Sequence, residues 1–259
     1  MSNAGLLKTL TRGLAILDYI AGRPDGVSNS QIAEVFDVDP AVSYRMLQTL
    51  THAQYVHKQG TLYRLSFRLF SLVRQSWASM LDLATPAVGA LAEETGFTVS
   101  LSVLEGHSAY PIILKQGESP LIVNANLGKR VPLHASSLGK ALWAHLPYEQ
   151  QLQIMASAEL SKLTPNTLVD EEELWQELAQ VRASGLAFDR EEYQLEIRCI
   201  AAPVLDRSES VICALSVSYP AAYALSDDAF ERNLAERIQC VARDLSNILG
   251  RAPSSMNSM

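Results

Sequence analysis

Five polar side chains within seven positions form the first set that could do chemistry: Ser43, Tyr44, Arg45, Gln48 and Thr49. An arginine and a glutamine three positions apart share one face of a helix. Each can form paired hydrogen bonds to the edge of a base in the major groove of DNA. Hydroxyl groups beside them suit phosphate oxygens, which position a protein on DNA without reading its sequence. This set predicts contact with double-stranded DNA.

Two short helices with a tight turn between them are predicted around these side chains. Ser28 and Gln31 have the spacing of a capping box, and Asp39-Pro40 has the form of a helix start. Apolar residues recur through both segments at helical spacing. We expect these apolar side chains to face inward from the two helices: Ile32, Val35, Phe36, Val42, Met46, Leu47 and Leu50.

A hairpin is predicted directly after the second helix. Its strands are Tyr55–Lys58 and Thr61–Leu65, with a turn at Gln59-Gly60. Helix, turn, helix and hairpin form a winged helix-turn-helix, which delivers one helix into a major groove. Lys58 and Arg64 on the wing are candidate DNA contacts, and Ser30 begins a helix whose free N–H groups suit a phosphate.

The charge is divided unevenly along the chain. Residues 1–75 hold eight Lys and Arg against five Asp and Glu, or +3, within a chain of net charge −7, so the rest carries −10. A basic head can contact phosphates locally, and an acidic body discourages non-specific binding to nucleic acid.

The rest of the chain predicts an α+β domain with an antiparallel sheet. The first helix is expected to turn one apolar face inward, formed by Leu7, Leu10, Leu14, Leu17 and Ile20. Helices are expected over 6–21, 66–83, 86–96, the end of 133–146, 148–156, 171–184 and 227–249; strands are expected over 97–104, 110–115, 121–124, 186–189, 197–205 and 211–218. The segment His134–Gly139 ends at a helix start, where unpaired backbone N–H groups suit a carboxylate.

Four sequence blocks and a shorter fifth occur in an order that resembles the IclR-type transcriptional regulators. They are Thr11–Leu17, the winged helix, Val131–Leu142, Arg198–Val204 and Ala214–Ser218. The resemblance implies a winged helix-turn-helix over 5–66, a linker helix over 67–83, a GAF-like effector-binding domain over 84–250 and a disordered tail over 251–259. It also implies homodimers, or dimers of dimers, on palindromic operators, controlled by a small organic acid.

The resemblance also implies an effector site. The backbone of Ser137 and Leu138 would hold the acid group. The polar partners would be Asp189, Cys199, Ser216 and Ser218, and the apolar wall would be Leu121, Val131 and Ile197. The alternative is that Cys199 is a core residue and the serines satisfy a sheet edge. Tyr110 and Tyr193 either line the site or pack against it.

Three further positions bear on the resemblance. Arg12 matches an arginine of the family and either contacts DNA or forms an ion pair within its own domain. Pro40-Ala41-Val42 stands where relatives usually carry Lys, Ser and Thr, which removes typical phosphate donors. Glu196 stands where many relatives carry a small residue, and we expect it to narrow the pocket or to repel an acidic ligand.

Other functions are less well supported by the residues. The three cysteines, Cys199, Cys213 and Cys240, form no Cys-x-x-Cys pair, so we expect no disulfide, no metal and no cofactor. His134, Asp189 and Cys199 contain the parts of a thiol hydrolase, but Cys199 lies in an apolar strand without a nucleophile motif. A sensor without DNA binding is the other alternative. There is no signal sequence and no apolar run long enough to span a bilayer, so we expect a cytoplasmic protein without a membrane partner.

Overall fold

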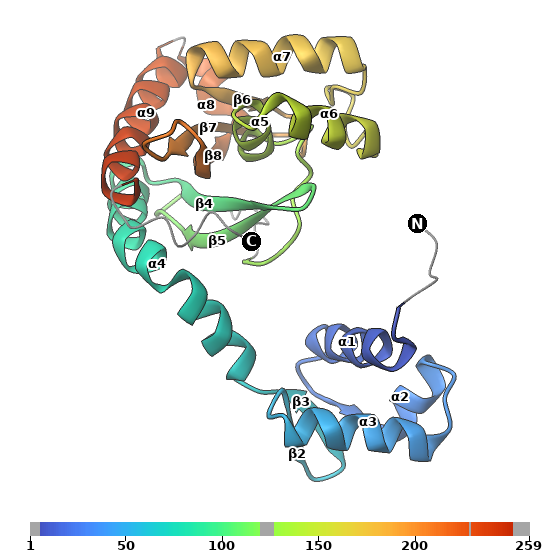
Figure 1. Cartoon of the computed structure of the whole chain (residues 1–259). Coiled ribbons are helices and arrows are strands. Elements are labelled where there is room, and N and C mark those ends of the chain that lie inside the picture. The colour runs from blue at the N-terminus through green and yellow to red at the C-terminus, as the bar shows by residue number, and fades with distance from the viewer. Residues whose placement is uncertain (1–5, 120–126, 228, 251–259) are drawn as a thin grey trace. The chain divides into compact units, whose positions relative to one another are not determined.

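The computed structural model describes residues 6–119, 127–227 and 229–250, with the backbone alone for 73–76. The chain divides into two compact units, Met1–Ala78 and Ser79–Met259, called here the N-terminal and the C-terminal unit. Figure 1 shows the order of their helices and strands.

The N-terminal unit is the expected winged helix-turn-helix. It contains α1 (Lys8–Ala21), α2 (Asn29–Val35) and α3 (Pro40–His52). A three-stranded antiparallel sheet has the order β1 (Val27–Ser28), β3 (Leu62–Leu65), β2 (Val56–Gln59). The side chains that form its buried core are Ile16, Ile20, Val27, Ile32, Leu47, Val56 and Tyr63.

Local capping signals begin both short helices as expected. Ser28 and Gln31 form a complete capping box before α2, and the Asp39 carboxylate accepts the N–H of Ala41 at 2.7 Å before Pro40. The wing turns at Gly60-Thr61, one residue later than expected, because Gln59 still pairs with Leu62. Gly60 takes the positive φ of +62° that this turn requires.

The first helix does not bury the apolar face that its leucines predicted. Leu7, which precedes α1, is 73% exposed, and Leu10 and Leu14 within it are 60% and 55% exposed. Ile20 is buried as predicted and Leu17 is partly buried, while Ile16, which was not predicted, also enters the core. Leucine and isoleucine residues at helical spacing predict one apolar face of a helix, but the spacing does not predict which other element packs against that face. Val35 of α2 is also exposed.

One helix replaces the two that were expected around Pro86. Helix α4 runs from Arg68 to Thr95 with Pro86 inside it. A proline removes one helical hydrogen bond, and tertiary packing can outweigh that loss. The buried side chains on either side of Pro86, Ala84 and Val88, are packed in the core of the C-terminal unit.

The C-terminal unit is built on a five-stranded, fully antiparallel sheet. Its order is β5 (Ser108–Lys115), β4 (Thr98–Glu105), β8 (Val211–Pro220), β7 (Ile197–Leu205), β6 (Ala187–Arg190). The predicted α+β class and antiparallel sheet are therefore confirmed. The expected strand over 121–124 and the tail over 251–259 lie outside the described residues.

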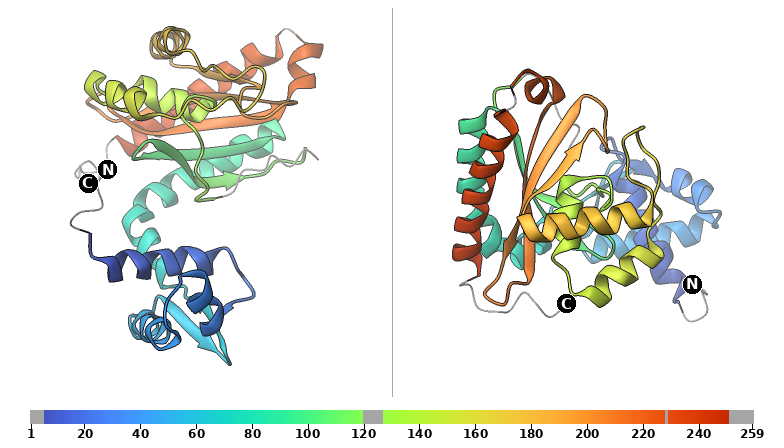
Figure 2. Two further views of the ribbon diagram at one scale, coloured as in Figure 1. Left: turned by 90° about the vertical axis from the view of Figure 1, so that its right-hand side faces the viewer. Right: turned by 90° about the horizontal axis from the view of Figure 1, so that it is seen from above.

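Helices cover both faces of this sheet. The end of α4 and α9 (Phe230–Leu249) lie side by side on one face, and α5 (Ser137–Ala144), α6 (Tyr148–Ser157) and α7 (Glu171–Ser184) lie on the other (Figure 2). The short α8 (Ala221–Ser226) precedes α9, which begins at Phe230 and not at Asp227.

Helix α5 is buried along its whole length. A side chain at Gly139 would place its Cβ 2.3 Å from the Cα of Leu133, so only glycine allows the helix to approach this segment. The close contact fixes the start of α5, where the candidate ligand site lies.

Candidate DNA-binding surface and ligand cavity

Helix α3 presents four of its five candidate side chains to solvent. Tyr44, Arg45, Gln48 and Thr49 are exposed. The Thr49 hydroxyl donates back to the carbonyl of Arg45 at 2.8 Å. The exposed face can therefore present a guanidinium and an amide to base edges, as the sequence predicted; whether they contact DNA stays a prediction.

Ser43 is the exception, and its predicted place on the exposed face is wrong. It is fully buried, and its hydroxyl donates to Asn29 Oδ1 at 2.6 Å. The amide of Asn29 in turn donates to the carbonyl of Pro40 at 3.0 Å. Ser43 thus ties α3 to α2, while Val42, expected to face inward, is exposed.

The remaining candidate DNA-contacting side chains differ in their exposure and in the contacts they already make within the protein. Lys58 is exposed, and its Nζ lies 5.9 Å from the centre of the Tyr44 ring, so Tyr44 packs beside the wing. Ser30 is exposed in the first turn of α2, and its hydroxyl pairs with that of Ser28. The guanidinium of Arg64 donates twice to the carbonyl of Asp25, which leaves less of it for DNA. Arg12 is half-buried and makes no ion pair to any residue that the structure describes.

A cavity of about 60 Å³ lies in the C-terminal unit at the start of α5. It is lined by Ser100, Pro111, Lys129, Val131, Ser136, Ser137, Leu138, Asp189, Tyr193, Gln194, Ile197, Cys199, Ser216 and Ser218. Eight of the nine predicted effector residues are in this set, brought together from α5, three strands and the segment before α5. The ninth, Leu121, lies outside the described residues.

The start of α5 supplies backbone donors to this cavity. Ser136 is the N-cap, and its hydroxyl accepts the N–H of Gly139 at 3.1 Å. The N–H groups of Ser137 and Leu138 precede the first helical hydrogen bonds, so they are left for another acceptor. A helix start with two such groups favours an anion.

The sheet supplies small polar side chains to the opposite wall. Cys199 pairs in register with Asp189 on β6 and with Ser218 on β8. The Cys199 thiol donates to Ser218 Oγ at 3.1 Å, and the hydroxyls of Ser137 and Ser216 lie 3.3 Å apart. These groups are small and already paired, so they leave space for a ligand without leaving polar atoms unsatisfied.

Asp189 is a buried acid in this wall. Its Oδ1 accepts the N–H of Glu192 at 2.7 Å and that of Tyr193 at 3.3 Å. Burial raises the pKa of Asp189 to about 7, opposed by the Glu192 N–H bond and reinforced by the charge of Glu192. The carboxyl can therefore exist in either protonation state near neutral pH.

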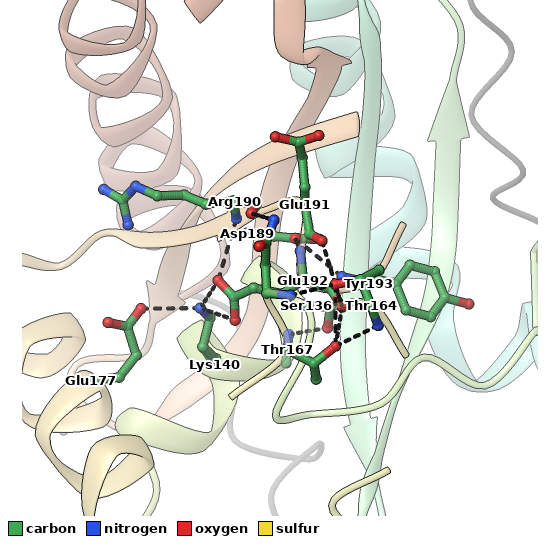
Figure 3. Close-up of polar contacts among 12 residues, drawn as sticks. Ser136, Lys140, Thr164, Thr167, Glu177, Asp189, Arg190, Glu191, Glu192 and Tyr193 are labelled. Carbon is green, nitrogen blue, oxygen red and sulfur yellow. Dashed lines mark hydrogen bonds and ion pairs between the residues drawn. The ribbon is translucent and has the colours of Figure 1, made fainter. Parts of the chain in front are cut away.

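A buried ion-pair network holds the loop that follows Asp189. Figure 3 shows Lys140 between Glu177 and Glu192. Its Nζ lies 2.7 and 2.9 Å from the two oxygens of Glu192 and 3.0 Å from Glu177 Oε1. The Thr164 and Thr167 hydroxyls donate to backbone carbonyls of the same loop. The network thus joins α5, α7 and the β6–β7 loop, three of the elements around the cavity.

The geometry gives no support to a thiol hydrolase. Burial raises the pKa of the Cys199 thiol well above its ordinary value, so the thiol stays protonated and is a poor nucleophile. His134 does not line this cavity; its Nε2 lies 3.0 Å from the carbonyl of Ser161. The three parts of that site are therefore not brought together.

Several lining residues were missed in the sequence, and one prediction about the pocket is wrong. Ser100 enters because β4 places it opposite Ser216, a register that no local pattern reveals. Lys129 adds a cation at the exposed edge of the cavity, and Tyr193 lines it while Tyr110 does not. Glu196 neither narrows nor charges the cavity: it is exposed with φ of +66°, a backbone conformation that favours glycine.

No cluster of His, Cys, Asp and Glu with the form of a metal site occurs among the described residues. No helix in the described ranges is long and apolar enough to cross a membrane.

Family descriptions match both units of the chain. "IclR helix-turn-helix domain" matches residues 9–60, and "Bacterial transcriptional regulator IclR C-terminal" matches residues 76–247. The chain belongs to the IclR family of transcriptional regulators. The HTH-type transcriptional repressor AllR of Salmonella paratyphi A is 33% identical over 251 residues, which cover 95% of this chain and 91% of that one.

Solved structures of this family share the fold. A transcriptional regulator from Rhodococcus sp. RHA1 aligns with a TM-score of 0.81 and 26% identity over 94% of this chain and 98% of its own. An IclR homologue from Microbacterium hydrocarbonoxydans, solved in complex with 4-hydroxybenzoate, aligns with a TM-score of 0.82 and 21% identity over 93% and 99% of the two chains.

Proposed function

We propose that this IclR-family regulator binds an operator in double-stranded DNA through α3 and the wing, and that a small organic acid in the C-terminal unit controls that binding. The observation that carries the proposal is the cavity at the start of α5, where backbone donors and small hydroxyls face one another. Because the relatives are named as repressors, we propose that this protein represses transcription when it is bound to its operator. A protein that acts on chromosomal DNA works in the cytoplasm.

The ligand is a small acid because of the size and the donors of the cavity. A space of about 60 Å³ admits only a few heavy atoms unless the walls move. The N–H groups of Ser137 and Leu138 and the amine of Lys129 suit a carboxylate, and Val131 and Ile197 suit a short apolar body. The 4-hydroxybenzoate complex of the Microbacterium homologue supports an organic acid as the class.

The proposed DNA contacts can be tested by selection from a random duplex library. The selected duplex should bind with an affinity that falls steeply with salt, since contacts to phosphates release counterions. Arg45→Ala and Gln48→Ala should each lose discrimination between bases with folding unchanged. A protein that selects no sequence, or binds all duplexes equally, would instead be a sensor without specific DNA binding.

The ligand can be tested by thermal shift of the whole chain against small organic acids. An acid at 100 times its Kd should add about 2.7 kcal/mol of stability to the C-terminal unit. Asp189→Ala or Ser218→Ala should remove the shift. A shift that survives both substitutions would place the ligand elsewhere.

We further propose that the regulator is a homodimer, or a dimer of dimers, on a palindromic operator. The support is the apolar surface of Leu7, Leu10 and Leu14, three leucines more than half exposed at or beside the first helix. Leucines at this spacing on one unit suit the same surface of a second copy. Leu10→Glu should lower the mass measured by light scattering; an unchanged mass would exclude this surface as the interface.

A further inference from the structure

Asp189 is the only acid among the described residues that line the cavity. It is 3% exposed, and one of its two oxygens is fixed by the N–H groups of Glu192 and Tyr193. The carboxyl is therefore held in place whatever its charge. Asp189 lines the same small cavity as Ser137 and Leu138, whose backbone N–H groups begin α5.

Among the described residues, the charge of Lys140 favours an ionised Asp189, but it is the smallest of the effects on the pKa of Asp189, because Lys140 is paired elsewhere. The ammonium of Lys140 has three protons, and its three close acceptors are two oxygens of Glu192 and one of Glu177. Lys129 lines the cavity only at the exposed edge and makes no ion pair to Asp189 in the described part of the chain. An ionised Asp189 would thus be a buried charge with two backbone N–H donors but no ion-pair partner among the described residues, which is costly.

The other groups that face Asp189 do not change this balance. Strand β7 contributes the Cys199 thiol, which is neutral, and β4 and β8 contribute serines. Glu192 and Tyr193, on the loop that follows Asp189, add a carboxylate and a phenol. A carboxylate ligand would add a further negative charge, and two carboxyl groups in one water-poor site share a proton.

We propose that Asp189 is protonated when the cavity holds an anionic acid, and that its O–H donates a hydrogen bond to the ligand carboxylate. This inference rests on the proposed function and specifies its recognition chemistry. Each binding event takes up one proton whenever Asp189 is ionised in the free protein. The occupant is therefore a monocarboxylic acid, because a second ionised carboxylate would add another negative charge to a site in which Lys129, at the exposed edge, is the only cation among the described lining residues.

The raised pKa of Asp189, about 7, sets the pH range of the effect. Below pH 6 the proton is already present, and the affinity for the acid should be constant. Above pH 7 the Kd should rise about tenfold per pH unit, or about 50-fold between pH 7 and pH 9.

The test is isothermal titration of the whole chain between pH 6 and pH 9. The probes are acetate, lactate, butyrate and 4-hydroxybenzoate, each in two buffers of different ionisation enthalpy, which gives the number of protons taken up. Asp189→Asn keeps a neutral donor in the place of the O–H group, so its Kd should be independent of pH and close to that of the unmodified protein at pH 6. Glu196→Gln, which removes an exposed carboxyl outside the cavity, should keep the original pH dependence.

The outcomes separate this inference from the proposed function. A probe that binds with the same Kd from pH 6 to pH 9, or loses binding in Asp189→Asn at every pH, would overturn the role of Asp189 and leave the ligand site standing. Failure of every probe to bind either protein at any pH would overturn both.

A titration of the free protein gives a readout without ligand. The ¹³C signal of the Asp189 carboxyl, assigned by its loss in Asp189→Asn, should change near pH 7. A change complete below pH 5 would overturn the inference.

Discussion

The ion-pair network around Lys140 makes the sharpest prediction about stability. Lys140 is fully buried, and its ammonium is bonded to Glu192 and Glu177. Lys140→Met fills a similar volume but leaves two carboxylates facing each other without a cation. Because breaking a buried ion pair leaves an uncompensated charge, we expect a loss of about 3–5 kcal/mol in the unfolding free energy of the C-terminal unit.

A second substitution shows whether the charge is the cause. Glu192→Gln removes the charge that Lys140→Met leaves behind, so the double variant should recover about half of the loss or more.

Urea unfolding followed by tryptophan fluorescence measures these changes. Trp143 and Trp175 lie in α5 and α7, next to the network, and a Trp77→Phe background removes the third tryptophan of the chain. An unchanged midpoint in Lys140→Met would show that the ion pair does not stabilise the unit, and a double variant whose loss equals the sum of the single losses would show that the unpaired charge is not the cause.

Three further predictions concern single side chains. Ser43→Ala should cost the N-terminal unit about 1–3 kcal/mol of unfolding free energy, because the half-buried Asn29 side chain loses the donor to its Oδ1. Arg45→Ala should leave urea unfolding unchanged and weaken DNA binding; the opposite pattern would contradict the assigned roles. Since the pKa of Asp189 is raised from 3.8 to about 7, its contribution to stability should be complete below pH 4 and fall by up to about 4 kcal/mol as the pH rises to 7 and above. Asp189→Asn should flatten the pH dependence of the unfolding free energy in urea titrations. A pH profile equal to that of the unmodified protein would exclude Asp189 as its cause. Gly139→Ala should lower the Tm of the C-terminal unit, because the new Cβ meets Leu133 at 2.3 Å; an unchanged Tm would mean that α5 can move away at no cost.

The features of the fold that depend on neighbouring residues could be predicted from the sequence. The capping box at Ser28 and Gln31 and the N-cap at Asp170 are complete within four residues, and both are present. Strand β7 has its predicted bounds because it is a run that is apolar apart from Arg198 and lies between the polar residues Glu196 and Asp206. These signals do not require knowledge of the partner element.

The features of the fold that depend on contacts between distant residues could not be predicted from the sequence. The depth of Ser43 follows from Asn29, fourteen positions earlier, and Pro86 remains within a helix because packing on both sides holds it there. The sequence blocks shared with the family predicted most of the residues that line the cavity. Ser100, however, enters the cavity through the register of the sheet, and Lys140 pairs with Glu192, which is 52 positions away in the sequence. Charge patterns along the chain do not reveal such pairs.

In the proposed function, the acid in the cavity controls the binding of DNA. This control is tested most directly by fluorescence anisotropy of a selected duplex, with and without the acid that gave a thermal shift, at fixed salt. A ligand that favours one state changes the DNA affinity by its differential affinity for the two states, typically about 5- to 150-fold. We expect such a change in the unmodified protein and its loss in Ser218→Ala; equal affinities with and without a bound acid would contradict control of DNA binding by the ligand.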